Sequence, residues 1–209
     1  MKTVCCGAIV LLFSALSCFC QQNTLLDRIK LNYSGKAAIS TSFDVHIAWK
    51  VRETEETRHG SIVLAPGDRF RVELGTGLWV SNGTTLWQFD RAISQVVIKQ
   101  LSATDPAMLP SSAVTRYCSD YPLAVLQQSG PDVVFEWKVG TSVAEHAGQV
   151  SYVKLVADKK SAVIKKLVVV DKMGNESSYT FSRTVLGKNV PSSTFEFEPP
   201  KGAHVLDQR

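Results

Sequence analysis

The sequence predicts a mainly β protein, an incomplete antiparallel β-barrel made from a curved meander sheet and covered by a helical lid. Three observations lead to this prediction. Segments of alternating apolar and polar residues recur along most of the chain, short turns separate them, and one amphipathic helix precedes them. Short connections imply antiparallel neighbours, and twist makes a sheet of about ten strands curl. A barrel, a half-barrel and a sandwich all satisfy this pattern.

The first 20 residues are predicted to be a secretory signal peptide. Lys2 supplies a positive charge, an apolar stretch opens at Ala8 and runs to about Phe19, and Gln21 begins a polar segment. The apolar stretch is short for a membrane span and has the flanks of an export signal. Residues 21–209 are then expected to form a single domain of an exported protein.

The cysteines bear on how this signal is processed. Cleavage after Cys20 is favoured over lipid modification of Cys18, because Ala15 stands where a lipoprotein signal usually has Leu. Four of the five cysteines lie in the leader, so the mature chain keeps Cys118 alone and cannot form an internal disulfide. For Cys118, packing as a small apolar side chain is favoured over a role as a nucleophile.

A helix is predicted from Thr24 to about Lys36. Asn23 is a suitable N-cap, and Gly35 is a suitable stop. Leu25, Leu26, Ile29 and Tyr33 would share one side of this helix.

Strands are predicted wherever the period changes to two. The first has Phe43, Val45, Ile47, Trp49 and Val51 on one face. Asn82-Gly83 is a two-residue hairpin signal. The other predicted strands are Ser61–Ala65, Arg69–Leu74, Leu78–Ser81, Thr84–Phe89, Gln95–Gln100, Val133–Val139, Gln149–Ala157, Ile164–Asp171, Ser177–Thr184 and a short one beginning at Thr194.

The alternation stops between about Ser102 and Gly130. This stretch contains three prolines and apolar pairs such as Met108-Leu109, which indicate short helices or loops. The apolar face of the sheet needs a cover, and the helix and this insertion are the only spare segments. Residues of about 23–36 and 102–130 are therefore the predicted lid elements, which favours a curved sheet with a helical lid.

No pattern of catalytic residues is present. The four histidines have no metal-ligand spacing, and the sequence lacks a nucleophile elbow, a phosphate-binding glycine loop and a dinucleotide fingerprint. The net charge of +4 is spread along the chain, which disfavours nucleic acid as a partner. The sequence therefore predicts a protein that is not an enzyme and that uses neither cofactor nor metal.

Apolar surface is the remaining feature. Each of the four tryptophans falls in a predicted strand, and for any single one core packing is the simplest explanation. Together, in an open curved sheet with few helices to fill it, they indicate a hydrophobic cavity.

Five segments give a resemblance to a known family. Arg69-Phe70-Arg71-Val72, the stretch from Val80 to Asp90 and then Gln95-Val96 follow an order that is found in LolA-type carriers. The segment from Asp105 to Leu109 resembles their threonine–proline lid segment, and that from Phe195 to Gly202, continued by Val205 to Arg209, resembles their C-terminal signature. The order and spacing of these segments resemble the LolA family over most of the mature chain.

The resemblance implies a function. LolA-type proteins are periplasmic carriers that shield the acyl chains of lipoproteins, so acylated lipoproteins are the implied cargo. An inner-membrane ABC-type release complex is the implied donor, and an outer-membrane receptor such as LolB is the implied acceptor. A monomer is expected. Other lipid or glycolipid carriers of this fold, LolB itself and a non-catalytic lipid-sensing module are alternatives.

The resemblance also implies site residues. Phe70 matches a family cavity position, and Leu26, Met108 and Leu109 match lid positions. We expect the lipid-binding wall to comprise Phe43, Trp49, Phe70, Val72 and Trp87, closed by Leu26, Met108 and Leu109.

One departure concerns how the lid is held. Many members carry an Arg-Pro pair just before the Phe70 position, and that arginine helps to hold the lid shut. This sequence has Pro66-Gly67 there, and proline cannot donate those hydrogen bonds. The lid is therefore expected to be held by other groups.

Overall fold

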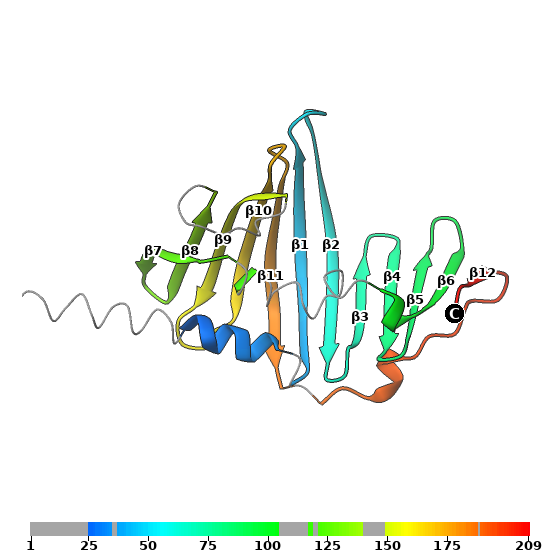
Figure 1. The fold of residues 1–209 in the computed structure, drawn as a ribbon. Helices are drawn as coiled ribbons and strands as arrows, with labels where there is room; N and C mark the ends of the chain where they lie inside the picture. Colours follow the sequence, from blue (N-terminus) through cyan, green and yellow to red (C-terminus); the bar gives the residue numbers. More distant parts are fainter. Residues whose placement is uncertain (1–24, 35–36, 105–116, 119–120, 140–148, 188) are drawn as a thin grey trace, which may run out of the picture.

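A computed structural model describes residues 25–34, 37–104, 117–118, 121–139, 149–187 and 189–209. Within them, one open sheet of twelve strands dominates (Figure 1). The strands are β1 (Ile39–Trp49), β2 (Thr54–Ala65), β3 (Arg69–Leu74), β4 (Gly77–Asn82), β5 (Thr85–Asp90), β6 (Gln95–Gln100), β7 (Ala124–Ser129), β8 (Asp132–Lys138), β9 (Val150–Asp158), β10 (Ile164–Asp171), β11 (Glu176–Leu186) and β12 (His204–Asp207).

The strand order is β12-β6-β5-β4-β3-β2-β1-β11-β10-β9-β8-β7. The sheet thus consists of two antiparallel meanders, β1–β6 and β7–β11, that join where β11 pairs with β1. β12 adds to β6 as a parallel strand, and β7 and β12 form the two edges. The predicted mainly β, open and largely antiparallel architecture is confirmed.

Local sequence explains most of these strands and turns. In β1, Phe43 and Val45 are buried while the intervening Asp44 is exposed, as its alternation predicts. The predicted β4–β5 hairpin forms at Asn82, whose side-chain oxygen accepts hydrogen bonds from the backbone N–H groups of Thr84 and Thr85 at 3.0 and 2.9 Å.

A helix of residues 25–33 crosses one face of the sheet over the β8–β11 half (Figure 1). We call this side of the sheet the helix face. The predicted amphipathic stripe is confirmed, because Leu25, Ile29 and Tyr33 are buried and Leu26 packs beside them. On β8–β10, the side chains that belong to the same buried cluster include Val133, Phe135, Trp137, Val153, Leu155 and Ile164.

The C-terminal segment covers the opposite face of β3–β6. Its single turn of 3-10 helix, η3 (Ser192–Phe195), buries Phe195 beneath the guanidinium of Arg69, 5.4 Å from the ring centroid. The ring of Phe197 lies 5.7 Å from that of Phe89 on β5. A strand was expected from Thr194, and this expectation is wrong: the packing of Phe195 selects a turn.

The predicted insertion of residues 102–130 also needs correction. A short turn, η1 (Leu101–Ala103), follows β6, but Ala124–Ser129 forms strand β7 instead of a helix or loop. Because Ala124-Val125-Leu126 is uniformly apolar and short, periodicity alone does not identify it as a strand. The predicted signal peptide, residues 1–20, lies outside the described residues.

Candidate functional site

The helix face is the candidate site, and strand register determines which side chains reach it. Directly paired residues of adjacent antiparallel strands point to the same face. Ile39 pairs with Leu64, Leu64 with Phe70, and Phe70 with Ser81, which pairs in turn with Leu86. This row runs from β1 to β5 and belongs to the face on which the helix packs.

Three of the predicted wall residues lie on this face. Phe70 is buried, Val72 is half-buried against the same cluster, and Phe43 is buried on β1. The Phe43 ring lies 6.3 Å from each of the rings of Tyr179 and Phe181 on β11, so an aromatic group occupies the centre of the sheet. Burial raises the pKa of the Tyr179 hydroxyl, which stays protonated at neutral pH.

Two aromatic rings of the helix face pack closely against glycines. A Cβ atom added at Gly60 would stand 2.6 Å from the Phe43 ring, and one added at Gly77 would stand 2.5 Å from the Trp79 indole. The absence of a side chain at these positions lets each ring cover the neighbouring backbone. Trp79 is half-buried against the core and was not singled out as a wall residue.

Trp49 shares the face of Phe43 but lies apart from it. It is six residues farther along β1, a separation of roughly 20 Å at the rise of a strand. It is paired with Thr54 at the start of β2, and the Arg52 guanidinium stands 5.5 Å from its ring. Trp49 therefore belongs to the end of the β1–β2 hairpin and not to the wall around Phe70.

The predicted position of Trp87 on the wall is wrong. Leu86 is the β5 residue in register with Ser81 and Phe70, so Trp87 points to the opposite face. There it is paired with Val80, which is buried. The residues of the helix face that were missed include Ile62, Trp79 and Leu86.

The structure describes only one of the three predicted lid residues. Leu26 lies on the helix, half-buried, and packs against the core cluster. Met108 and Leu109, the other two predicted lid residues, lie outside the described residues.

A hollow of about 630 Å³ opens beside Trp79. Its lining combines apolar side chains such as Leu74 and Val97 with polar and charged ones, which are Arg58, Thr76, Gln88, Asp90 and Gln95. Cavities of this size accommodate small organic ligands. The helix thus closes the helix face over β8–β10. Over β3–β6 Phe70 and Leu86 are also buried, and the hollow lies beside the half-buried Trp79, toward the β3–β4 and β5–β6 turns.

Polar side chains of the helix attach it to the β9–β10 turn, residues 159–163. Asn32 Nδ2 donates to the carbonyl oxygens of Ser161 and Ala162 at 3.0 and 3.1 Å. Arg28 donates to the carbonyls of Lys159 and Lys160. None of these contacts involves the position where the family arginine is expected, since Pro66 only accepts, from Arg69 Nε at 2.9 Å.

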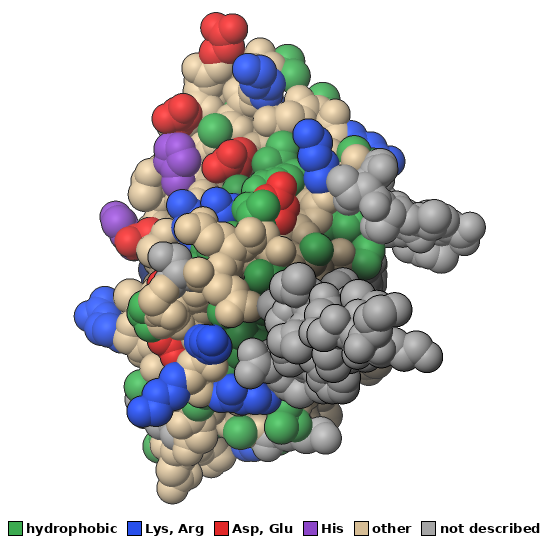
Figure 2. Space-filling model, turned by 90° about the vertical axis from the view of Figure 1, so that its left-hand side faces the viewer, with side chains coloured by type: hydrophobic (Ala, Val, Ile, Leu, Met, Phe, Trp, Pro, Cys, Tyr) green, Lys and Arg blue, Asp and Glu red, His purple; other side chains and the backbone are tan. Residues whose placement is uncertain are grey.

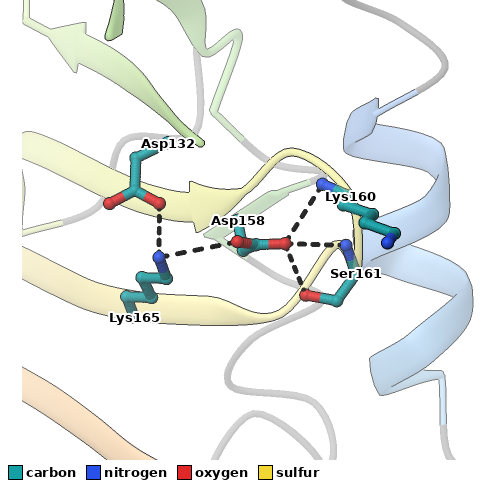
Figure 3. Close-up of polar contacts among 5 residues, drawn as sticks. All are labelled: Asp132, Asp158, Lys160, Ser161 and Lys165. Atoms are coloured by element: carbon teal, nitrogen blue, oxygen red, sulfur yellow. Dashed lines mark hydrogen bonds and ion pairs between the residues drawn. The ribbon is translucent and has the colours of Figure 1, made fainter. Parts of the chain in front are cut away.

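Asp158 organises the turn that receives the helix (Figure 3). Its Oδ1 accepts hydrogen bonds from the Ser161 amide and hydroxyl, both at 2.8 Å, and from the Lys160 amide at 3.1 Å. Its Oδ2 lies 3.5 Å from Lys165 Nζ, which also binds Asp132. The hydrogen bonds from Ser161, with help from Lys165, hold the pKa of the Asp158 carboxyl below its ordinary value.

The groups that could supply chemistry are not arranged for it. Cys118 is buried in the core cluster, and desolvation raises the pKa of its thiol to about 11, so the reactive thiolate is scarce at neutral pH. In the part of the chain that the structure describes, no three His, Cys, Asp or Glu side chains come together as metal ligands. No described helix is both long and apolar enough to cross a membrane.

Comparison with known proteins agrees with this arrangement. Residues 36–198 match the family described as outer membrane lipoprotein carrier protein LolA. An outer-membrane lipoprotein carrier protein of Vibrio parahaemolyticus is 30% identical over 94% of this chain and 90% of its own. One of Vibrio cholerae is 28% identical over 96% and 98%.

A crystal structure shares the fold. It is that of an uncharacterized conserved protein from Thermus thermophilus, with a TM-score of 0.57 and 15% identity over 89% of this chain and 98% of that one. Together with the sequence matches over nearly the whole length, this leads to one conclusion. The chain belongs to the LolA family of outer membrane lipoprotein carrier proteins, which are not enzymes.

Proposed function

We propose that this lipoprotein carrier holds the acyl chains of its cargo on the helix face, in and beside the hollow over β3–β6. The family is periplasmic and carries lipoproteins toward the outer membrane. The proposed binding residues are Leu26, Phe43, Ile62, Phe70, Val72 and Trp79, with Met108 and Leu109 as proposed lid residues. We further propose export through a cleaved signal peptide and a single monomeric carrier domain of residues 21–209.

The observation that supports this proposal most directly is the uneven cover of the helix face. Over β8–β10 the helix completes a closed core, and Phe135 and Leu155 are fully buried. Over β3–β6, Val72 and Trp79 remain half-buried next to a hollow of about 630 Å³. Apolar side chains that line an open cavity offer a surface for apolar ligands.

The energetics favour such a surface for acyl chains. Each methylene removed from water contributes roughly 0.8 kcal/mol, so several acyl chains represent tens of kcal/mol. A protein that transports them without an energy source must bind them about as well as its acceptor does. A face with an open hollow beside a closed core suits this requirement better than a core that is closed throughout.

The proposed donor is an inner-membrane ABC-type release complex, and the proposed acceptor is an outer-membrane receptor such as LolB. Exchange between these partners would require the helix to move without unfolding the sheet. The polar contacts of Arg28 and Asn32 with the β9–β10 turn suit that requirement, because hydrogen bonds near the surface are individually weak.

A pair of neighbouring residues on β2 tests the proposal. Ile62 points to the helix face, and Val63 points to the opposite face, where it is paired with Arg71. Both are half-buried. We expect Ile62→Asp to abolish the release of lipoproteins from inner-membrane spheroplasts into the supernatant, and Val63→Asp to retain it.

Circular dichroism and urea denaturation of both variants serve as controls for folding. Mass spectrometry of the gently purified full chain should detect a co-purified acylated species in the Val63→Asp variant and none in Ile62→Asp. Equal release by two folded variants would contradict binding on the helix face. A wild-type protein that neither retains acylated species nor releases lipoproteins would refute the proposed function.

A further inference from the structure

Three exposed apolar side chains protrude from one end of the sheet. Val51, in the β1–β2 turn, is 72% exposed; Met173, in the β10–β11 turn, is 65% exposed; and Val139, after β8, is 49% exposed. Single exposed apolar side chains are ordinary on a protein surface, but several at one end of a sheet can mark an interaction site.

The β1–β2 and β10–β11 turns lie side by side at the upper end of the sheet in Figure 1, and β8, two strands away from β10, ends at the same end. The Lys50 amide donates to Asn175 Oδ1 at 3.0 Å, which joins the β1–β2 tip to the β10–β11 turn. The Val139 amide donates to the Ser151 carbonyl at 2.9 Å, and Ser151 Oγ donates to the Asp171 carbonyl at 2.8 Å. We call residues 50–53, 138–139 and 172–174 the tip rim.

A basic residue stands beside every apolar residue of the tip rim. The order is Lys50-Val51-Arg52 in the first tip, Lys138-Val139 in the second and Lys172-Met173 in the third. Within the tip rim four cations thus accompany one carboxylate, that of Glu53, while Asp171 and Glu55 lie directly beside it. Figure 2 shows the upper end of the molecule, where hydrophobic, basic and acidic side chains are interspersed.

The cations of the first and third tips are available to a partner. Lys50 and Lys172 are exposed and, among the described residues, form no ion pair, and Arg52 contacts the Trp49 ring. The nearby Asp171 carboxylate accepts hydrogen bonds from the Met173 and Asn175 amides at 2.8 and 2.9 Å, and it keeps one negative charge beside the third tip.

We propose that the tip rim docks transiently on a bilayer surface that contains anionic phospholipids. Val51, Met173 and Val139 would enter the boundary between headgroups and acyl chains, while Lys50, Arg52 and Lys172 contact the phosphates. Exposed apolar residues flanked by Lys and Arg suit such an interface, and single contacts of this kind are weak and reversible.

The position of the hollow adds a reason for this arrangement. Its lining includes Gly75, Thr76 and Ile93, which belong to the β3–β4 and β5–β6 turns at the same end of the sheet. Docking through the tip rim would bring the opening of the hollow toward the bilayer. The docking itself is independent of which cargo the hollow accepts.

Sedimentation of the full chain with vesicles tests the proposal. We expect binding to vesicles of phosphatidylcholine with about one-third phosphatidylglycerol, a decrease in binding at high salt, and little binding to phosphatidylcholine alone. The double variant Val51→Ser/Met173→Ser should lower the partition coefficient about tenfold or more. Its matched control, Val185→Ser/Leu126→Ser, removes two exposed apolar side chains elsewhere and should retain binding.

A second set of variants tests the charges. Lys50→Gln, Arg52→Gln and Lys172→Gln should each weaken binding roughly fivefold. The control is one triple variant, Lys159→Gln/Lys166→Gln/Lys201→Gln. It removes three positive charges from exposed positions outside the tip rim, as many as the three tip-rim variants remove together. Absence of wild-type binding to anionic vesicles, or an equal loss in tip-rim and control variants, would overturn the proposal. The Ile62→Asp variant should still sediment with vesicles, which separates docking from acyl-chain binding.

Discussion

Tyr33 on the helix accepts, through its hydroxyl oxygen, a hydrogen bond from the backbone amide of Ile164 at 3.1 Å, and both residues are buried. The residues are 131 positions apart in the sequence. This bond fastens the C-terminal end of the helix to the first residue of β10. Burial, partly offset by this bond, raises the pKa of the Tyr33 hydroxyl, so it stays neutral at physiological pH.

Removal of this hydroxyl should destabilise the fold. Tyr33→Phe keeps the ring but leaves the buried Ile164 amide without its acceptor, which we expect to lower the free energy of unfolding by about 1–3 kcal/mol. Urea denaturation followed by circular dichroism measures the change. Tyr152→Phe is the control, because its half-exposed hydroxyl has no hydrogen bond among the described residues. Equal stability of the two variants would contradict the role of Tyr33.

The polar attachment of the helix should control release of cargo. Arg28→Ala/Asn32→Ala removes side chains that bind the carbonyls of residues 159–162 but leaves Leu25, Ile29 and Tyr33 to pack. We expect faster dissociation of a fluorescent diacyl lipopeptide, with a smaller change in the free energy of unfolding than in Tyr33→Phe. Lys30→Ala, on the same helix, is the control; an unchanged dissociation rate in the double variant would exclude this attachment as a latch.

Two tryptophans on neighbouring strands distinguish the faces of the sheet. Trp79 points to the helix face and Trp87 to the opposite face, and both are half-buried. A bromine-labelled acyl chain should quench fluorescence in wild type and in Trp87→Phe, and much less in Trp79→Phe. If quenching depended on Trp87 instead, acyl chains would bind the face that the C-terminal segment covers.

Acid should loosen the turn that receives the helix. Because the folded-state pKa of Asp158 lies below its unfolded value, its stabilising contribution is complete above the unfolded pKa and disappears as pH falls through the folded pKa. Asp158→Asn should therefore be less stable than wild type at neutral pH, and the difference should narrow below about pH 4. The midpoints of denaturant unfolding between pH 7 and pH 3 measure this difference in stability. Glu198→Gln, which replaces an exposed carboxylate, is the control. A difference that stayed constant with pH would argue against the ionised carboxylate as the organiser of the turn.

The Cys118 thiol should be inert in the folded protein. It is buried, and its pKa of about 11 keeps it protonated at neutral pH. We expect N-ethylmaleimide at pH 7.5 to modify Cys118 slowly in buffer and fully in urea, as peptide mass spectrometry would measure. Rapid modification of the native protein would show that the core around Cys118 opens frequently.

Local patterns sufficed for the strands that alternate or end in strong turns. β3, β6 and β10 have the predicted bounds, and the β4–β5 hairpin forms at Asn82 as expected. β7 was missed because its sequence lacks alternation, and β12 because four residues at the end of the chain are too short a signal. β12 exists through its parallel pairing with β6, a contact that no local pattern encodes.

The position of Trp87 could not be predicted from periodicity because both faces of β5 are covered. Leu86 lies in the core of the helix face, whereas Trp87 and Phe89 lie on the side where Phe197 packs. When a strand is apolar on both faces, its sequence does not show which side chains face the core of the helix face and which face the C-terminal segment. Register with Ser81 on β4 decides it.

The sequence by itself determined that the chain forms a largely antiparallel meander with one N-terminal amphipathic helix, because strand alternation and helix periodicity are local properties. Only the tertiary structure decided that Arg28, Asn32 and Tyr33 hold that helix and that Trp79 rather than Trp87 lines the helix face. It also decided that the β1–β2 turn, the β10–β11 turn and the end of β8 lie at one end of the sheet. Each of these outcomes depends on contacts between residues that are far apart in the chain. Pairing of the strands brings those residues together.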